Sequence, residues 1–200
     1  CQRCLISWTE ERKVRMSDIR TRALRKTEME GRRWVRIMLA VVCIALHRGW
    51  KFGTKRLHEL LMETQRIWNE CAKQENVSIL MMLEDETGIE LKPTDDSPSY
   101  HDLVYLNGTP KEEVEMSNAA YCYMRVQQTK WMGTMMEAAM FLALYRCMDY
   151  GFSADMLKKL VTMIQEIRSE YKDNYKKLWK ACREEAGIDL YEFERKGVIE

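Results

Sequence analysis

The chain has 200 residues, of which 32% are charged and 46% hydrophobic, as in an ordinary folded protein that needs neither metal nor disulfide for stability. Only three prolines and nine glycines are present, which favours long helices over many short strands. The net charge of +1 is unlike that of a typical DNA-binding domain. The longest apolar run, residues 37–46, is too short for a membrane span of about 20 residues, which argues against a membrane protein.

The charge is unevenly distributed along the chain. Residues 1–36 carry a net +6 and residues 37–74 a net +3, whereas residues 75–120 carry −9 and residues 121–200 carry +1. The basic part can bind phosphate, and the acidic part can imitate phosphate or pair with the basic part. Seven cysteines without a recognisable signal peptide indicate a cytoplasmic protein with reduced thiols. We expect Met16 to be a natural start.

Residues 1–32 are predicted to form a basic N-terminal extension that is helical from about residue 8. Helical spacing of apolar residues then predicts three helices over residues 33–91. The first two are joined by an aromatic-glycine turn, Phe52-Gly53, and Thr54 is expected to cap the second helix. Gly88 follows the third helix and is expected to end it, with the next isoleucine packed back onto the helix.

The same pattern recurs about 98 to 100 residues later. The matching stretches are IALHRGWKFG (44–53) with LALYRCMDYG (142–151), LHELLMETQRIWNEC (57–71) with LKKLVTMIQEIRSEY (157–171), and LEDETGIEL (83–91) with CREEAGIDL (182–190). In the second stretch Ser153 is expected to cap a helix and Gly187 to end one. We therefore predict two related units of three helices each, at residues 33–91 and 130–200.

Residues 92–129 are predicted to connect these units. They include all three prolines and an Asn-Gly turn, and residues 101–106 fit a short strand or a packed loop. Thr109-Pro110-Lys111-Glu112 has capping-box spacing, which predicts a helix start near residue 109. The predicted fold class is all-α, with two tandem three-helix units and an irregular acidic connection.

Two macromolecular binding surfaces follow from the charge pattern. The first helix, the tight turn and the second helix of the first unit could form a helix-turn-helix motif that binds nucleic acid. Its candidate residues are Arg22, Arg25, Lys26, Arg33, Lys55 and Arg56. Ala154 and Asp155 stand near the corresponding place in the second unit, so this role would not be shared. An acidic surface for a protein partner has the candidate residues Glu84, Asp85, Glu86, Asp95 and Asp96.

A zinc site is a further hypothesis. Cys1 and Cys4 form a CxxC pair, and Cys43 and His47 are four residues apart on a predicted helix, which together gives a Cys3His ligand set. Phe141 and Tyr145 replace Cys43 and His47 in the second unit, which favours buried packing positions instead. No phosphate-binding loop, dinucleotide-binding or hydrolase motif is present. We therefore expect neither a cofactor nor catalysis.

The residues Ala45-Leu46-His47, Phe52-Gly53, Lys55-Arg56-Leu57 and Glu86-Thr87-Gly88-Ile89-Glu90 together resemble small uncharacterised phage and prophage proteins of Gram-positive bacteria. Trp50-Lys51 and the apparent duplication depart from that pattern. The resemblance implies a phage-related setting in a bacterial cytoplasm and no catalytic residues. We expect a non-catalytic accessory protein that binds a host or phage macromolecule and interferes with a host defence or regulatory complex. The alternatives are a nucleic-acid-binding regulator and a zinc-stabilised or enzymatic protein.

Overall fold

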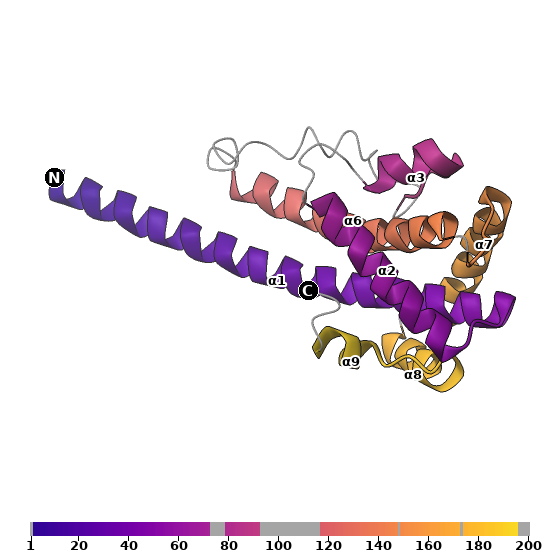
Figure 1. Cartoon of the computed structure of the whole chain (residues 1–200). Coiled ribbons are helices and arrows are strands. Elements are labelled where there is room, and N and C mark those ends of the chain that lie inside the picture. The colour runs from indigo at the N-terminus through magenta and orange to yellow at the C-terminus, as the bar shows by residue number, and fades with distance from the viewer. Residues whose placement is uncertain (1, 73–78, 93–116, 148, 173, 196–200) are drawn as a thin grey trace. The chain divides into compact units, whose positions relative to one another are not determined.

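A computed structural model describes residues 2–72, 79–92, 117–147, 149–172 and 174–195 of the chain. All elements in these ranges are α-helices, which confirms the predicted all-α class (Figure 1). The helices are α1 (Gln2–Trp50), α2 (Thr54–Ala72), α3 (Ile79–Thr87), α6 (Asn118–Arg146), α7 (Ala154–Tyr171), α8 (Tyr175–Glu185) and α9 (Leu190–Arg195). Residues 101–106, predicted as a short strand or a packed loop, and the predicted helix start near residue 109 lie outside the described residues.

The chain divides into two compact units. Unit 1 comprises Cys1–Arg33 and Lys92–Met132, and unit 2 comprises Trp34–Leu91 and Gly133–Glu200. The predicted basic N-terminal helix and the first helix of the first repeat are one continuous element, α1. Unit 2 contains the first predicted repeat from residue 34 onward and the second predicted repeat from residue 133 onward. The division into tandem three-helix units remains a prediction.

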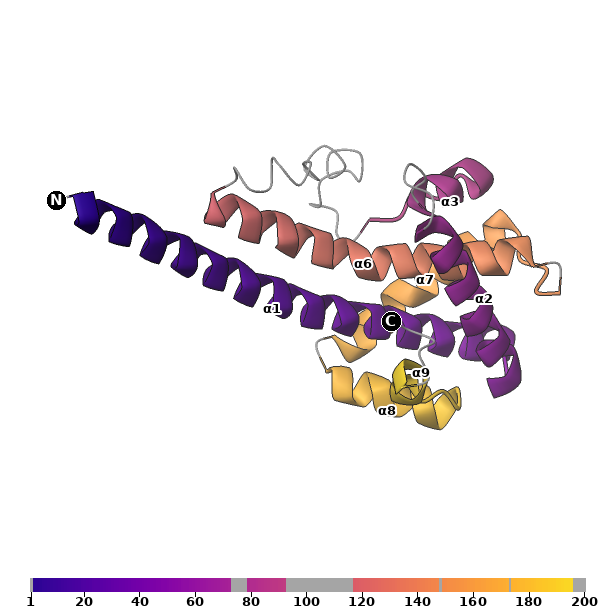
Figure 2. The ribbon, with the colours of Figure 1, turned by 60° about the vertical axis from the view of Figure 1, so that its left-hand side comes forward.

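In unit 1, α1 and α6 run in parallel. Arg20 lies over the Tyr121 ring at 5.1 Å, the Thr129 hydroxyl donates to the Thr27 carbonyl at 3.4 Å, and the Met132 side chain packs against Gly31. A methyl group on Gly31 would lie 2.5 Å from the Met132 sulfur, so glycine permits this close approach. Contacts whose residue numbers rise together on both helices define a parallel pair, and both ribbon views agree (Figures 1 and 2).

In unit 2, the later parts of α1 and α6 form the core. Nearly every residue from Val35 to Leu46 and from Gly133 to Leu144 is buried. Helices that are apolar on all sides must be surrounded by other elements. The apolar spacing that predicts α2 and α7 places one buried face on each helix. Their buried residues are Leu57, Leu60, Leu61, Thr64 and Ile67 on α2, and Leu157, Leu160, Ile164 and Ile167 on α7.

The two corners that precede α2 and α7 differ from the prediction. The residue with left-handed backbone is Lys51 (φ 58°) in the first corner and Gly151 (φ 64°) in the second, and each precedes a buried phenylalanine, Phe52 or Phe152. Gly53 has no left-handed φ, so the predicted equivalence of Gly53 and Gly151 is wrong. The mismatch arises because the second corner is two residues longer than the first. Ten residues separate Leu46 from Leu57, whereas twelve separate the matching Leu144 from Leu157.

One of the two predicted N-caps is confirmed. The Ser153 side chain accepts a hydrogen bond from the Met156 backbone N–H at 3.3 Å, as a cap of α7 does. Thr54 is instead the first residue of α2, because the Gly53 carbonyl already accepts the Leu57 N–H. The Thr54 hydroxyl donates to the Ala186 carbonyl at 3.3 Å, so it joins α2 to the turn after α8.

Both predicted glycine stops are confirmed. Gly88 (φ 68°) adopts left-handed backbone directly after α3, and Gly187 (φ 71°) does so after Ala186, the C-cap of α8. The isoleucines that follow them, Ile89 and Ile188, are buried. The sequence GI in each tail therefore ends a helix and returns an apolar side chain to the core.

Candidate functional sites

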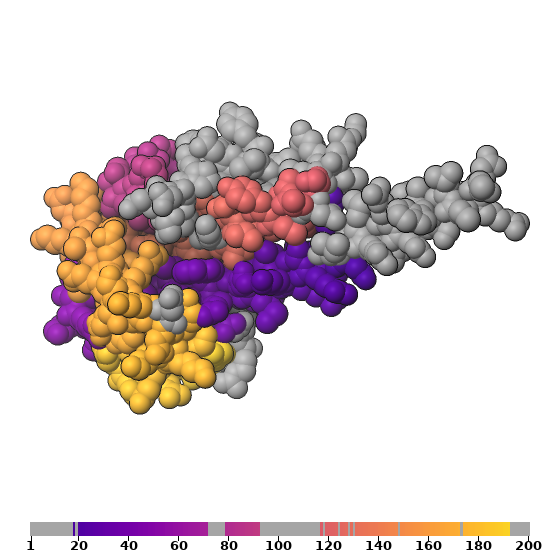
Figure 3. Space-filling model, turned by 180° about the vertical axis from the view of Figure 1, so that it is seen from behind, coloured from indigo at the N-terminus to yellow at the C-terminus, as the bar shows by residue number. Residues whose placement is uncertain are grey.

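Five cations lie on one side of α1 in unit 1, and we call this surface the basic face. At 100° per residue, Arg22, Arg25, Lys26, Arg32 and Arg33 fall within a sector of about 120°. All five side chains are exposed. The opposite side of α1 contains Thr27 and Gly31, which are buried against α6. Figure 3 shows this early part of α1, in dark indigo, uncovered beside α6.

One ion pair of the basic face joins neighbouring turns of α1. The Lys26 ammonium lies 4.0 Å from the Glu30 carboxylate, which is a loose and exposed ion pair. Met29 lies in the same sector and is 73% exposed. Closely spaced arginines and lysines of this kind are suited to phosphate groups, because guanidinium and ammonium groups donate several hydrogen bonds to anionic oxygens.

The two other predicted nucleic-acid contacts, Lys55 and Arg56, belong to unit 2. Arg56 lies over the Phe52 ring at 4.1 Å and the Tyr150 ring at 5.7 Å, and it donates to the Asp149 carbonyl at 3.4 Å. These contacts hold the two corners together. Lys55 is exposed, and its ammonium is 3.9 Å from the Glu59 carboxylate. The helix-turn-helix hypothesis therefore retains Lys55 as an exposed cation, whereas Arg56 has a packing role.

His47 also has a structural role in the first corner. Its Nδ1 lies 2.9 Å from the Phe52 carbonyl oxygen. Since a carbonyl only accepts, Nδ1 carries the proton and donates it to this bond. The imidazole thus holds the chain where it turns from α1 into α2.

The structure describes only part of the predicted zinc ligand set. The Cys43 thiol is fully buried and contacts the Cys182 thiol, and this contact and burial raise the pKa of Cys43 well above its usual value. Because the thiolate is the metal-binding form, this setting disfavours coordination. Cys1 and the Cys4 side chain lie outside the described part of the chain. Among the described residues, no group of three or more His, Cys, Asp or Glu side chains could hold a metal ion.

The predicted acidic surface is divided. Glu84 and Asp85 are exposed on α3, one turn from Met81, which is 40% exposed. Glu86 points instead to α6, where its carboxylate pairs with the Arg146 guanidinium through two contacts, one of them at 3.1 Å. Asp95 and Asp96 lie outside the described residues.

Arg48 forms a second guanidinium–carboxylate cluster, at the end of α1. Its Nη1 donates to Glu170 at 2.7 Å, its Nε to Glu185 at 2.9 Å, and its Nη2 to the Tyr171 hydroxyl at 3.2 Å. These bonds lower the pKa of both carboxyl groups. Arg48 and Arg146 are the arginines that the two predicted repeats share. Arg48 joins α1 to α7 and α8, and Arg146 joins α6 to α3.

Glu137 is a buried carboxyl group that is not among the residues predicted from the sequence. It lies on α6 with 4% of its surface exposed, and burial raises its pKa to about 7. The Arg168 guanidinium, 3.4 Å away, opposes this shift but does not cancel it. The sequence feature that could have indicated this buried group is a single carboxylate within the largely apolar stretch TMMEAAMFLAL.

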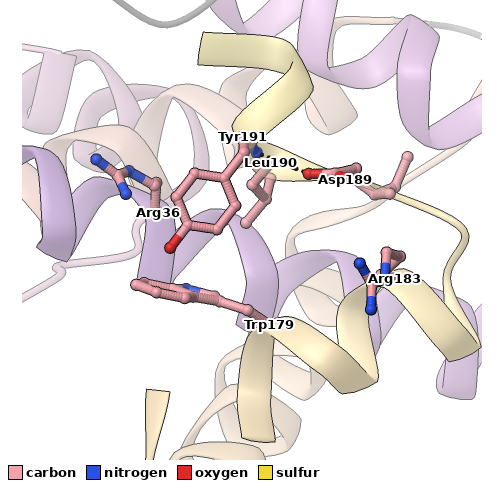
Figure 4. Close-up of a pocket in the computed structure, with 7 residues that line it drawn as sticks. Arg36, Trp179, Arg183, Asp189, Leu190 and Tyr191 are labelled. Atoms are coloured by element: carbon pink, nitrogen blue, oxygen red, sulfur yellow. Dashed lines mark hydrogen bonds between the residues drawn. The ribbon is translucent and has the colours of Figure 1, made fainter. Parts of the chain in front are cut away.

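A shallow hollow lies between α1, α8 and the start of α9 (Figure 4). Its volume of about 70 Å³ is room for a few water molecules or one small anionic group. In Figure 4, Trp179 lies below Tyr191, with Arg36 and Arg183 on opposite sides. The Asp189 carboxylate accepts the backbone N–H of Tyr191 at 3.0 Å, and so caps α9. The lining combines two arginines and the Asp189 carboxylate with aromatic walls, and the Trp179 N–H is buried.

No protein-family model, curated protein or solved structure matches this chain. None of the described helices is both long enough and apolar enough to cross a membrane.

Proposed function

We propose that this is a non-catalytic binding protein and that the basic face of α1 binds the phosphate backbone of nucleic acid. The observation that carries the proposal is the position of five exposed cations on one side of a helix whose other side is packed. Packing of Thr27 and Gly31 against α6 fixes which side is presented to a ligand.

The spacing of these cations suits a polyphosphate chain. Arg22 and Arg33 are separated by eleven residues, or about 17 Å along the helix axis, so several phosphates can be contacted at once. Contacts of this kind fix the position of a nucleic acid but carry no base-sequence information. We therefore expect binding with little sequence preference and a strong dependence on salt.

A charge-reversal experiment on the full chain tests this proposal. We expect Arg22→Glu/Arg25→Glu to weaken binding of a labelled duplex by about tenfold or more at low salt. The matched control is Lys158→Glu/Lys159→Glu on α7, which makes the same charge change at exposed positions of unit 2. Equal losses in both double variants would show a general charge effect and contradict binding at the basic face.

The exposed side of α3 supports a second candidate, which is binding to a protein partner. Met81, Glu84 and Asp85 lie together on this side, and Met62 on α2 is 55% exposed. Exposed methionine beside acidic residues suits a partner with a basic, partly apolar surface. In a phage-derived accessory protein such a surface would engage a host defence or regulatory complex. Capture from bacterial lysate that is lost in Glu84→Lys/Asp85→Lys, and survives nuclease, would support this candidate.

We also propose that the chain contains two related three-helix units. The support is the shared sequence of features in each stretch: a left-handed residue, a buried phenylalanine, an amphipathic helix, a left-handed glycine and a buried isoleucine. The phage-related setting remains a proposal that rests on the resemblance of the first stretch. The cytoplasmic location remains a proposal that rests on this resemblance and on the seven cysteines.

A further inference from the structure

The first helix of the first repeat, the part of α1 from residue 34, contacts the helices of the second repeat. Arg48 binds Glu170 and Glu185 on α7 and α8. Cys43 contacts Cys182 on α8, and the α7 residue Met163 packs against Gly49, where an added methyl group would lie 2.8 Å from its terminal carbon. These three contacts, one polar, one between thiols and one apolar, thus reach the other repeat.

The corresponding helix of the second repeat, the later part of α6, contacts the helices of the first. Arg146 binds Glu86 on α3. The charge of Arg146 also acts on Glu63 and on Cys71, which are both on α2. The corners interlock as well, because Arg56 of the first repeat covers Tyr150 of the second, and Phe52 packs against Phe152 with ring centroids 6.0 Å apart.

We infer that the two repeats are packed in a crossed manner, in which the end of the first helix of each repeat is bound by the second or third helix of the other. One ion pair also lies within a repeat, because Arg168 on α7 pairs with Glu137 on α6. The structure thus corresponds to a homodimer whose two subunits have been joined into one chain. This inference extends the proposed duplication and is independent of nucleic-acid binding.

The two reciprocal ion pairs give the most specific evidence for the crossed packing. Arg48 and Arg146 are 98 residues apart, and their carboxylate partners Glu185 and Glu86 are 99 residues apart. Each arginine therefore pairs with the carboxylate of the opposite repeat and not with that of its own. A related chain with only one repeat would use this same surface to pair with a second copy of itself.

Charge exchange in the full chain tests the crossing. Arg48→Glu and Arg146→Glu should each lower the denaturant midpoint of unfolding, because each leaves like charges facing one another. We expect Glu185→Arg to recover most of the shift caused by Arg48→Glu, and Glu86→Arg to recover most of that caused by Arg146→Glu.

The matched controls exchange partners within one repeat. Arg48→Glu combined with Glu86→Arg, and Arg146→Glu combined with Glu185→Arg, should show no recovery if the pairs are crossed. Recovery in these two variants in place of the first two would overturn the inference. Duplex binding enters neither measurement, so failure here and failure of the proposed function are distinguishable.

Discussion

Replacement of Glu137 by glutamine should make the protein more stable at neutral pH and remove part of its pH dependence. The carboxyl group is buried on α6, and its pKa is raised from 4.5 to about 7. A raised pKa in the folded state means that folding retains a proton which the unfolded chain releases. The unfolding free energy of the natural protein therefore falls as the pH rises from 4.5 to about 7.

The size of this effect follows from the two pKa values. At about 1.4 kcal/mol for each pKa unit, ionisation of Glu137 costs about 3 kcal/mol above pH 7. Glutamine has nearly the same shape and does not ionise, so Glu137→Gln should lack this loss. The difference between the two unfolding free energies should then grow by about 3 kcal/mol from the acid to the neutral side of the transition.

Urea unfolding followed by far-UV circular dichroism at a series of pH values measures this difference. Glu166→Gln, an exposed change on α7, is the matched control and should leave the pH profile unchanged. Parallel profiles for the natural protein and Glu137→Gln would refute the reasoning, because Glu137 would then have the same pKa in the folded and unfolded chains.

Three further predictions concern the fold. Gly187→Ala should lower the unfolding free energy by about 2–3 kcal/mol, since a left-handed alanine is strained and its methyl group would meet the Thr54 hydroxyl. Gly151→Ala, with φ 64° and open space around it, should lower it by only about 1 kcal/mol, and equal losses in thermal melts would contradict the contact with Thr54. Arg48→Met should lose about 1 kcal/mol at neutral pH, and the loss should disappear as acid protonates Glu170 and Glu185, whose pKa values Arg48 lowers. Leu57→Ala and Leu157→Ala should each lose about 2–5 kcal/mol within one cooperative denaturant transition, whereas two separate transitions would indicate independent repeats.

Features that depend on neighbouring residues along the chain could be predicted from the sequence. The apolar faces of α2 and α7 follow from helical spacing, and the stops at Gly88 and Gly187 follow from the need for a left-handed residue at a helix end. The cap at Ser153 is of the same kind. Each of these features depends on a few adjacent residues. The folded structure adds only the surface against which these residues pack.

Features set by distant contacts could not be predicted in this way. The boundary predicted between residues 1–32 and the first helix of the first repeat does not interrupt α1, which continues past Gly31 where Met132 packs against it. Lys51 adopts the left-handed conformation although a lysine gives no signal for it, because the corner is held by His47 and the buried Phe52. The stacking of Arg56 on Tyr150 and the raised pKa of Glu137 likewise depend on residues far away in sequence.

The salt dependence of duplex binding tests the central claim most directly. If the basic face contacts about four phosphates, the logarithm of the binding constant should fall with the logarithm of salt concentration with a slope of about −3.6. Neutralisation of one contact, as in Arg25→Gln, should reduce the slope by about 0.9, and Lys159→Gln should leave it unchanged. Absence of salt-dependent binding at low ionic strength, or a slope unaffected by changes across the basic face, would contradict nucleic-acid binding at this surface.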